Sequence, residues 1–288
     1  MTASRGTAPA DTFWMGAHKT GTTFLQKSLD LSQPALQAAG VQYIELGEFR
    51  RLYTRPLLND GHPDPVDAAP TASGRRLIFD ENIIGLVQHA LCSAGLYPKA
   101  ARRALRVADH LGLVQPRIVL GLRGFRGFLP SLYCEALKST EFSRFRKFCI
   151  TPEQALSWDD LIGRLAAVFP HSEILIYTAE ALRGREKALL SVVTGLTPEA
   201  LSLLGQAERP GFSQKAVRAL HELAKTRPVT RQDVIQQNQL HPRGAKTPGF
   251  DPWKPDEAAR LDEIYAADLA RLLQRPQVRF LDPELAVK

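Results

Sequence analysis

The sequence has few cysteines. Its 288 residues include only three, Cys92, Cys134 and Cys149, and no two of them stand at C-x-x-C spacing. An odd number in a chain of this length argues against a disulfide framework, and the spacing argues against a structural zinc site. We therefore expect three small, partly buried apolar side chains in a reducing compartment, and no metal site.

Long apolar runs are also missing. No stretch reaches the roughly 18 apolar residues that a membrane-spanning helix needs. Residues 1–11 are polar and lack the apolar centre of a secretory signal. The sequence thus predicts a soluble, cytoplasmic protein without a transmembrane segment, whose residues 1–11 are flexible.

The composition is that of a globular protein, with 44% hydrophobic and 23% charged residues. Lys and Arg total 37 against 30 for Asp and Glu, and the resulting charge of +7 favours an anionic partner. That surplus does not choose between nucleic acid, an acidic glycan and a nucleotide. No basic and aromatic module of a known type is present, so we expect no nucleic-acid partner. The oligomeric state is left open.

Short apolar segments alternate with helical ones along the chain. Strands are expected over residues 12–17, 41–46, 75–79, 117–122 and 173–177, and helices over 22–39, 82–94, 97–112, 126–139, 151–169 and 256–274. Residues 53–74 are rich in Pro, Asp, Gly and Ala and predict a long loop. This alternation predicts one α/β domain over 1–288: three α/β/α layers, a central, mostly parallel sheet and a mainly helical extension over 197–288.

The first expected strand, turn and helix contain residues 16–23, GAHKTGTT. The glycine spacing is that of a phosphate-binding loop, whose backbone N–H groups and helix N-terminus converge on an anion. Thr22 and Thr23 add hydroxyl donors. Nucleotide triphosphatases carry lysine directly after the second glycine, whereas here that position is Thr22 and the lysine is Lys19. A glycine turn entering a helix beside a solvated Lys19 is the simpler alternative.

The strand over residues 117–122 is followed by a cation. An enzyme that transfers phosphate would place an Asp near this point to hold magnesium, but this chain has Arg123. An arginine at the carboxyl end of a parallel strand lies where ligands bind in such folds. Its guanidinium can form bidentate hydrogen bonds with a phosphate group. Ser131 follows on the first turns of the next helix. Taken singly, Arg123 is a surface arginine and Ser131 a local helix hydroxyl; together with the loop they favour an anion site.

These segments resemble sulfotransferases that use 3′-phosphoadenosine 5′-phosphosulfate (PAPS), including bacterial ones. Residues 18–23 resemble the 5′-phosphosulfate-binding loop, and Arg123 with Ser131 resembles the 3′-phosphate-binding pair. Two further segments are similar in order along residues 12–196. Residues 77–82 (LIFDEN) resemble the strand that delivers a catalytic acid, and 174–182 (ILIYTAEAL) the segment whose tyrosine approaches the adenine.

The resemblance implies transfer of a sulfuryl group from PAPS to a hydroxyl of a carbohydrate, lipid or other small molecule, without a metal. Lys19 would stabilise the departing 5′-phosphate, and Glu81 would be the general base. The remaining implied binding residues are the loop, the 3′-phosphate pair and a tyrosine: His18, Thr20, Gly21, Thr22, Thr23, Arg123, Ser131 and Tyr177. After Tyr177 the chain departs from the family, because Thr178-Ala179-Glu180 replaces the expected acidic pair.

Two of the roles that the resemblance implies also have simpler structural explanations. Asp80 is next to Glu81, but alternation along an extended segment points it the other way, and Glu81 itself could simply cap a helix. A late Arg/Lys-Gly loop closes over the nucleotide in the family, which would assign Arg243 and Lys246 to PAPS. The alternative for residues 241–255 is a surface loop leading into the last helix.

Other functions stay possible at this stage. A P-loop small-molecule or nucleotide kinase would need ATP and magnesium, and both the displaced Lys19 and the missing acid after residues 117–122 argue against it. A non-catalytic binder of anionic ligands and a PAPS-binding fold without turnover are the remaining alternatives. No residue identifies the acceptor substrate.

Overall fold

A computed structural model describes residues 11–59, 61, 62, 64–67, 74–205 and 211–281. Six strands form its central sheet, in the order β2-β3-β1-β6-β7-β8, and all five neighbouring pairs are parallel. The strands are β1 (Thr12–Trp14), β2 (Val41–Tyr43), β3 (Arg75–Phe79), β6 (Arg117–Leu122), β7 (Ile174–Thr178) and β8 (Val278–Phe280). The predicted α/β class with a parallel sheet is confirmed.

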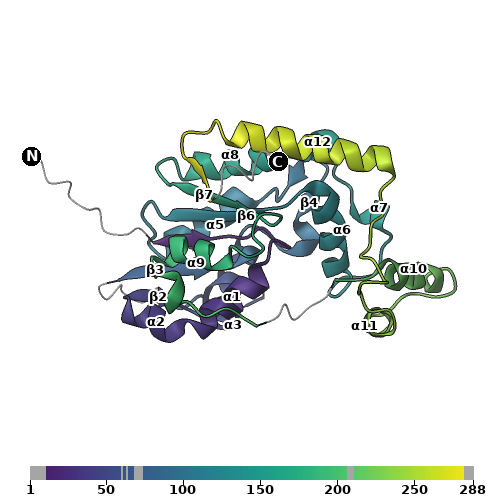
Figure 1. Ribbon diagram of the computed structural model, residues 1–288, viewed down its shortest axis with the longest axis horizontal. Coiled ribbons are helices and arrows are strands. Elements are labelled where there is room, and N and C mark those ends of the chain that lie inside the picture. Colours follow the sequence, from purple (N-terminus) through teal and green to yellow (C-terminus); the bar gives the residue numbers. More distant parts are fainter. Residues whose placement is uncertain (1–10, 60, 63, 68–73, 206–210, 282–288) are drawn as a thin grey trace, which may run out of the picture.

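Helices cover both faces of the sheet (Figure 1). One face packs against α1 (Thr22–Leu31), α2 (Gln33–Ala38) and α9 (Glu186–Thr194), with Trp14 stacked on Phe79 at 3.9 Å between ring centroids. The other face packs against α5 (Ala100–His110), α6 (Phe125–Ala136), α8 (Trp158–Val168) and α12 (Pro255–Leu272). Because both faces are covered, the central strands β1, β6 and β7 are mostly apolar and buried.

The C-terminal part holds more than helices. A helix pair, α10 (Gln214–Leu223) and α11 (Arg231–Leu240), lies to one side of the body (Figure 1). Beyond α12 the chain returns to the sheet as β8, which pairs with β7 and forms one edge. The expectation of a mainly helical extension over 197–288 missed β8, because three residues at a sheet edge show no alternation that a sequence pattern can register.

Several expected elements are shorter or different. The helix over 22–39 is two helices that meet at Ser32. The expected helix over 82–94 is instead two 3-10 turns, Glu81–Ile83 and Val87–His89, followed by the small hairpin β4 (Leu91–Cys92) and β5 (Gly95–Leu96). The helix expected from Thr151 begins at Trp158, because Ser157 caps it by accepting a hydrogen bond from the Asp160 N–H.

The loop expected over 53–74 starts later than predicted. Helix α3 (Leu46–Phe49), a π-helical turn (Arg50–Thr54) and α4 (Arg55–Leu58) run without a break to Leu58. A further short helix, α7 (Phe145–Phe148), and 3-10 turns at Glu153–Ala155 and Pro198–Ala200 complete the described elements. Asp11, expected in a flexible start, accepts hydrogen bonds from the backbone and side chain of Arg76; residues 1–10 lie outside the described residues.

Candidate functional site

The loop between β1 and α1 turns sharply above the carboxyl end of β6. Lys19 and Gly21 have φ of 65° and 89°, a left-handed backbone that glycine adopts without strain and lysine does at a cost. The loop is tied to the sheet by the Ala17 N–H, which donates to the Gly121 carbonyl at 2.9 Å. The Thr20 hydroxyl donates to the Ala17 carbonyl at 2.7 Å. The turn at residues 16–21 is therefore held in place before any ligand arrives.

Lys19 reaches across to α6. Its Nζ lies 2.9 Å from Glu135 Oε2, and the Lys138 Nζ lies 2.8 Å from the same oxygen. Burial would raise the pKa of Glu135, but the two lysines outweigh it and lower the pKa to about 2. Glu135 is therefore ionised at neutral pH and shares one oxygen between two cations. Nothing in the sequence pattern pointed to this acid.

Arg123 lies beside the loop with an unusual set of neighbours. Its Nη1 donates to the Lys19 carbonyl at 3.1 Å, and within the described residues no carboxylate forms an ion pair with it. Burial lowers its pKa, Glu180 opposes that shift and Arg243 adds to it. A half-buried arginine without an acid partner favours an anionic ligand.

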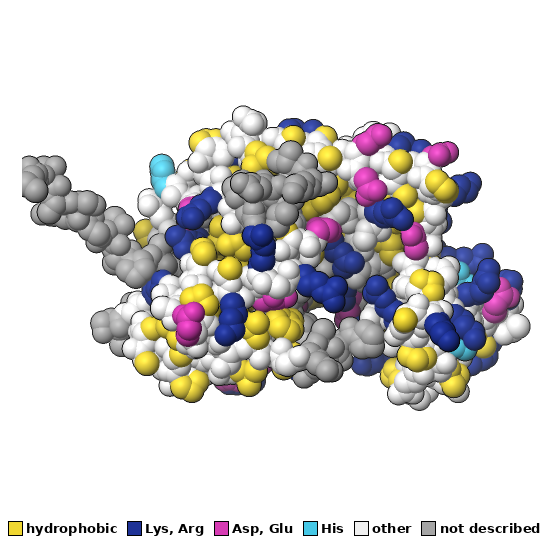
Figure 2. Space-filling view, in the orientation of Figure 1, with side chains coloured by type: hydrophobic (Ala, Val, Ile, Leu, Met, Phe, Trp, Pro, Cys, Tyr) yellow, Lys and Arg dark blue, Asp and Glu magenta, His cyan; other side chains and the backbone are white. Residues whose placement is uncertain are grey.

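One cavity of about 560 Å³ brings four of the predicted binding residues together. Lys19, Arg123, Ser131 and Arg243 all line it, although they come from four different parts of the chain. Figure 2 shows basic side chains beside the hollow between the main body and the α10–α11 pair. Lys246 is exposed and is absent from the lining residues.

The cations of this cavity divide into paired and unpaired ones. Arg126 lies 3.4 Å from Asp251, and Glu135 engages both lysines. Arg123 and Arg243 form no ion pair among the residues described, and Arg243 is close enough to help lower the pKa of Arg123. The Arg243 guanidinium lies against Gly249, in the segment that packs beside the start of α10. Arg123 and Arg243 therefore face one cavity without an ion-pair partner among the described residues.

Other predicted residues lie beneath the loop. Tyr177 is only 2% exposed, and its hydroxyl lies 3.2 Å from the Thr20 hydroxyl. The Tyr177 ring therefore contacts the loop at Thr20. Thr22 is buried in the first turn of α1, whereas Thr23 is exposed.

His18 of the loop is buried. Its Nδ1 lies 3.0 Å from the Tyr97 hydroxyl and its Nε2 lies 3.1 Å from Asn82 Oδ1. Burial lowers the pKa of His18, which favours the neutral ring, with Nε2–H donating to Asn82 and Nδ1 accepting from Tyr97. This geometry suits a residue that shapes the turn.

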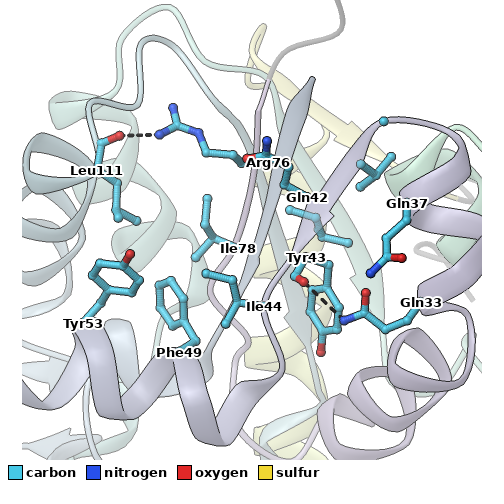
Figure 3. Close-up of a pocket in the computed structure, with 13 residues that line it drawn as sticks. Gln33, Gln37, Gln42, Tyr43, Ile44, Phe49, Tyr53, Arg76, Ile78 and Leu111 are labelled. Atoms are coloured by element: carbon cyan, nitrogen blue, oxygen red, sulfur yellow. Dashed lines mark hydrogen bonds between the residues drawn. The ribbon is translucent and has the colours of Figure 1, made fainter. Parts of the chain in front are cut away.

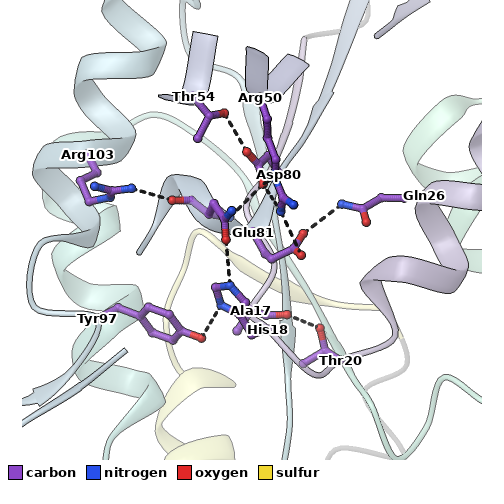
Figure 4. Close-up of polar contacts among 11 residues, drawn as sticks. Ala17, His18, Thr20, Gln26, Arg50, Thr54, Asp80, Glu81, Tyr97 and Arg103 are labelled. Carbon is purple, nitrogen blue, oxygen red and sulfur yellow. Dashed lines mark hydrogen bonds and ion pairs between the residues drawn. The ribbon is translucent and has the colours of Figure 1, made fainter. Parts of the chain in front are cut away.

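Glu81 lies where β3 ends, with its Cβ against Gly16 of the loop (Figure 4). Its Oε1 is 3.2 Å from Arg50 Nη2, and its Oε2 accepts from Gln26 Nε2 at 2.9 Å. Burial favours the protonated form, but Arg50 leads the groups that outweigh it, and the pKa of Glu81 is lowered. The sequence singled out Glu81 but neither Arg50 nor Gln26, because both are distant in the chain and carry no motif.

A second cavity, of about 450 Å³, lies beside the edge strand β2 (Figure 3). Its wall is mostly apolar and amide in character, with Phe49, Tyr53 and Ile78 on one side and Gln33 near Tyr43 on the other. Its one cation, Arg76, already pairs with Asp11 and donates to the Leu111 carbonyl. This cavity therefore offers no anion site.

The described residues contain no group of three or more His, Cys, Asp or Glu side chains that could hold a metal ion. No helix among them is both long and apolar enough to cross a bilayer.

Comparison with known proteins detects little similarity. No model of a known protein family matches the chain, and no curated protein matches it. Among solved structures, a sulfotransferase from Alicyclobacillus acidocaldarius is similar, with 14% sequence identity over 83% of this chain and 98% of that chain, and a TM-score of 0.42.

Proposed function

We propose that this protein is a sulfotransferase that binds PAPS in the cavity at Lys19 and Arg123 and transfers its sulfuryl group to an acceptor hydroxyl. One observation carries the proposal: Arg123 and Arg243 face the same cavity without an acid partner among the described residues. Two neighbouring cations that form no ion pair favour a doubly charged group such as a phosphate monoester.

The two ends of PAPS are assigned to two parts of the site. The 3′-phosphate is assigned to Arg123, Ser131 and Arg243 and the 5′-phosphosulfate to Lys19, all of which line the cavity, and also to Thr22 at the start of α1. Tyr177 acts through Thr20 rather than on the nucleotide, because it is buried beneath the loop. Lys246 receives no role, since it is exposed outside the cavity lining.

The transfer itself is an in-line substitution at sulfur. The acceptor oxygen forms a bond to sulfur as the bond from sulfur to the 5′-phosphate oxygen breaks. Lys19 stabilises the charge that develops on the departing phosphate, after it exchanges Glu135 for the nucleotide. The proton of the acceptor hydroxyl passes to Glu81, whose lowered pKa keeps it ionised and ready at neutral pH.

Thermal unfolding with adenosine 3′,5′-bisphosphate tests the binding site. A ligand at one hundred times its Kd adds about 2.7 kcal/mol of stability, and each kcal/mol raises the Tm of a domain of about this size by about 2 to 4 °C. We therefore expect a rise of roughly 5 to 10 °C, and none of that size with ATP and magnesium. Stabilisation by ATP and magnesium alone would favour a kinase and reject PAPS as donor.

A matched pair of variants locates the effect. Arg123→Met removes an unpaired cation and should abolish the rise in Tm. Arg126→Met removes a cation of the same cavity that is already paired with Asp251, so it should leave most of the rise. Equal losses in the two variants would contradict the assignment of Arg123.

Turnover is tested separately with PAPS labelled at sulfur and a panel of sugar, lipid and phenol acceptors. Glu81→Gln should bind adenosine 3′,5′-bisphosphate like the unmodified protein and lose transfer by about 100-fold or more. Full turnover in Glu81→Gln would remove this residue as the base. Binding without transfer to any acceptor in the unmodified protein would favour a non-catalytic nucleotide-binding protein.

A further inference from the structure

Arg50 lies between two neighbouring carboxylates at the end of β3. Its Nε and Nη2 donate to Asp80 Oδ1 at 2.9 and 2.7 Å, and the same Nη2 lies 3.2 Å from Glu81 Oε1. One guanidinium therefore contacts both acids (Figure 4). Ordinary alternation would separate these two side chains; the 3-10 turn that begins at Glu81 brings the carboxylates to the same side.

The two acids differ in what else surrounds them. Asp80 is fully buried and also accepts from the Thr54 hydroxyl at 2.7 Å and the Asn82 N–H at 3.0 Å. Its oxygens are saturated with donors, so it cannot approach a ligand. The Glu81 side chain keeps 12% of its surface exposed and adjoins the phosphate loop at Gly16.

The segment that carries Arg50 has special geometry. Arg50 and Thr54 begin and end the π-helical turn, and both bind Asp80. A π-helical turn is uncommon and occurs often at functional sites. Arg50 and Thr54 are four residues apart and converge on one carboxylate, so the turn is fixed to the end of β3 through Asp80.

We propose that Arg50 is a positioning residue for sulfuryl transfer: anchored by Asp80, its guanidinium fixes the direction of the Glu81 carboxylate beside the loop at Gly16. The inference rests on the proposed function of Glu81. Asp80 serves as the anchor rather than as a base, and Gln26 holds the second oxygen of Glu81 from α1. Asp80 thus has a structural role, whereas Glu81 is the proposed general base.

The charged groups that face Glu81 make the idea testable. They are Arg50 on the π-helical turn, Asp80 on the same strand end and His18 in the loop. Arg103 of α5 is near Asp80 but is occupied by backbone carbonyls, including those of Ile83 and Asn82. Removing Arg50 should raise the titration midpoint of Glu81, whereas removing the charge of Asp80 should lower it.

The experiment uses protein labelled with ¹³C in the glutamate carboxyl groups and follows their NMR shifts against pH. The signal absent from Glu81→Gln identifies Glu81. We expect its midpoint to rise by about 1 to 3 pH units in Arg50→Gln, the size typical of a close opposite charge, and to fall in Asp80→Asn. Thr54→Val is the matched control: it removes a donor to Asp80 but no charge, and should move the midpoint least.

Turnover with labelled PAPS supplies the second measurement. Arg50→Lys keeps the positive charge but cannot hold both carboxylates as a planar fork does. It should therefore keep the Glu81 midpoint low while transfer falls about tenfold or more and affinity for adenosine 3′,5′-bisphosphate stays unchanged. If Arg50→Gln is too unstable, Arg50→Gln with Asp80→Asn removes both charges together and still strips Arg50 from Glu81.

Specific results would overturn the inference. A Glu81 midpoint that stays the same in Arg50→Gln would mean that Arg50 does not act on Glu81. Full turnover in Arg50→Lys would also reject positioning. Failure of the proposed function looks different: the NMR midpoints shift as expected, but Glu81→Gln keeps full transfer or the protein binds no adenosine 3′,5′-bisphosphate.

Discussion

Replacing Glu135 by glutamine is a sharp test of the cavity, because one residue links its electrostatics to its ligand. Glu135 holds Lys19 and Lys138 at 2.9 and 2.8 Å, and its side chain is only 28% exposed. The carboxylate stabilises the unliganded protein, yet it places a negative charge on the wall of a site proposed for phosphate. Glu135→Gln should therefore lower stability and strengthen nucleotide binding at the same time.

The loss of stability follows from the pKa. The folded protein lowers the pKa of Glu135 from 4.5 to about 2, and each unit corresponds to about 1.4 kcal/mol. Allowing for partial exposure, we expect Glu135→Gln to lower the free energy of unfolding by about 1 to 3 kcal/mol at pH 7. A depressed pKa stabilises the fold above the unfolded value, so the difference between the two proteins should shrink as pH falls from about 4.5 toward 2.

The gain in binding has an electrostatic origin. A unit charge about 8 Å from a ligand phosphate contributes about 2 kcal/mol at an effective dielectric constant of about 20. Without that repulsion, and with Lys19 free to turn to the ligand, adenosine 3′,5′-bisphosphate should bind about tenfold tighter to Glu135→Gln. Tighter binding in a less stable protein is not what a general packing defect would produce.

Urea unfolding at several pH values and isothermal titration calorimetry measure the two effects. Glu141→Gln, which removes an exposed acid beyond the end of α6, is the control and should change neither. Weaker or equal nucleotide binding in Glu135→Gln would refute the placement of the phosphates next to Lys19. Unchanged stability would refute the importance of the lysine pair.

Two further predictions concern the support of the loop. Gly121→Ala places a methyl group on the Thr20 and Tyr177 hydroxyls, so it should displace the loop, lower the Tm and abolish stabilisation by adenosine 3′,5′-bisphosphate; a normal nucleotide-induced rise in Tm would show that the loop tolerates the shift. Tyr177→Phe removes only the hydroxyl beside Thr20, and it should cost about 1 kcal/mol of stability while nucleotide affinity changes less than threefold, as calorimetry can verify.

Part of the site could be predicted from sequence because its signals are local. The glycines and lysine of the loop are within six residues of each other, and Arg123 directly follows an apolar β-branched strand. Glu135 and Arg50 could not be found in this way. Glu135 contacts Lys19 across 116 residues of sequence and Arg50 contacts Asp80 across 30, and neither contact leaves a periodic pattern.

The sequence by itself determined the strand–loop–helix units, since apolar runs, glycines and caps act over a few residues. Parallel strands bring their carboxyl ends to one edge, so the convergence of Lys19 and Arg123 was predictable in outline. Only the tertiary structure decided which charges are compensated: it pairs Lys19 with Glu135, leaves Arg123 and Arg243 without an acid among the described residues, and buries Tyr177 under the loop. Charge compensation depends on distances between residues far apart in the chain, and folding alone sets those distances.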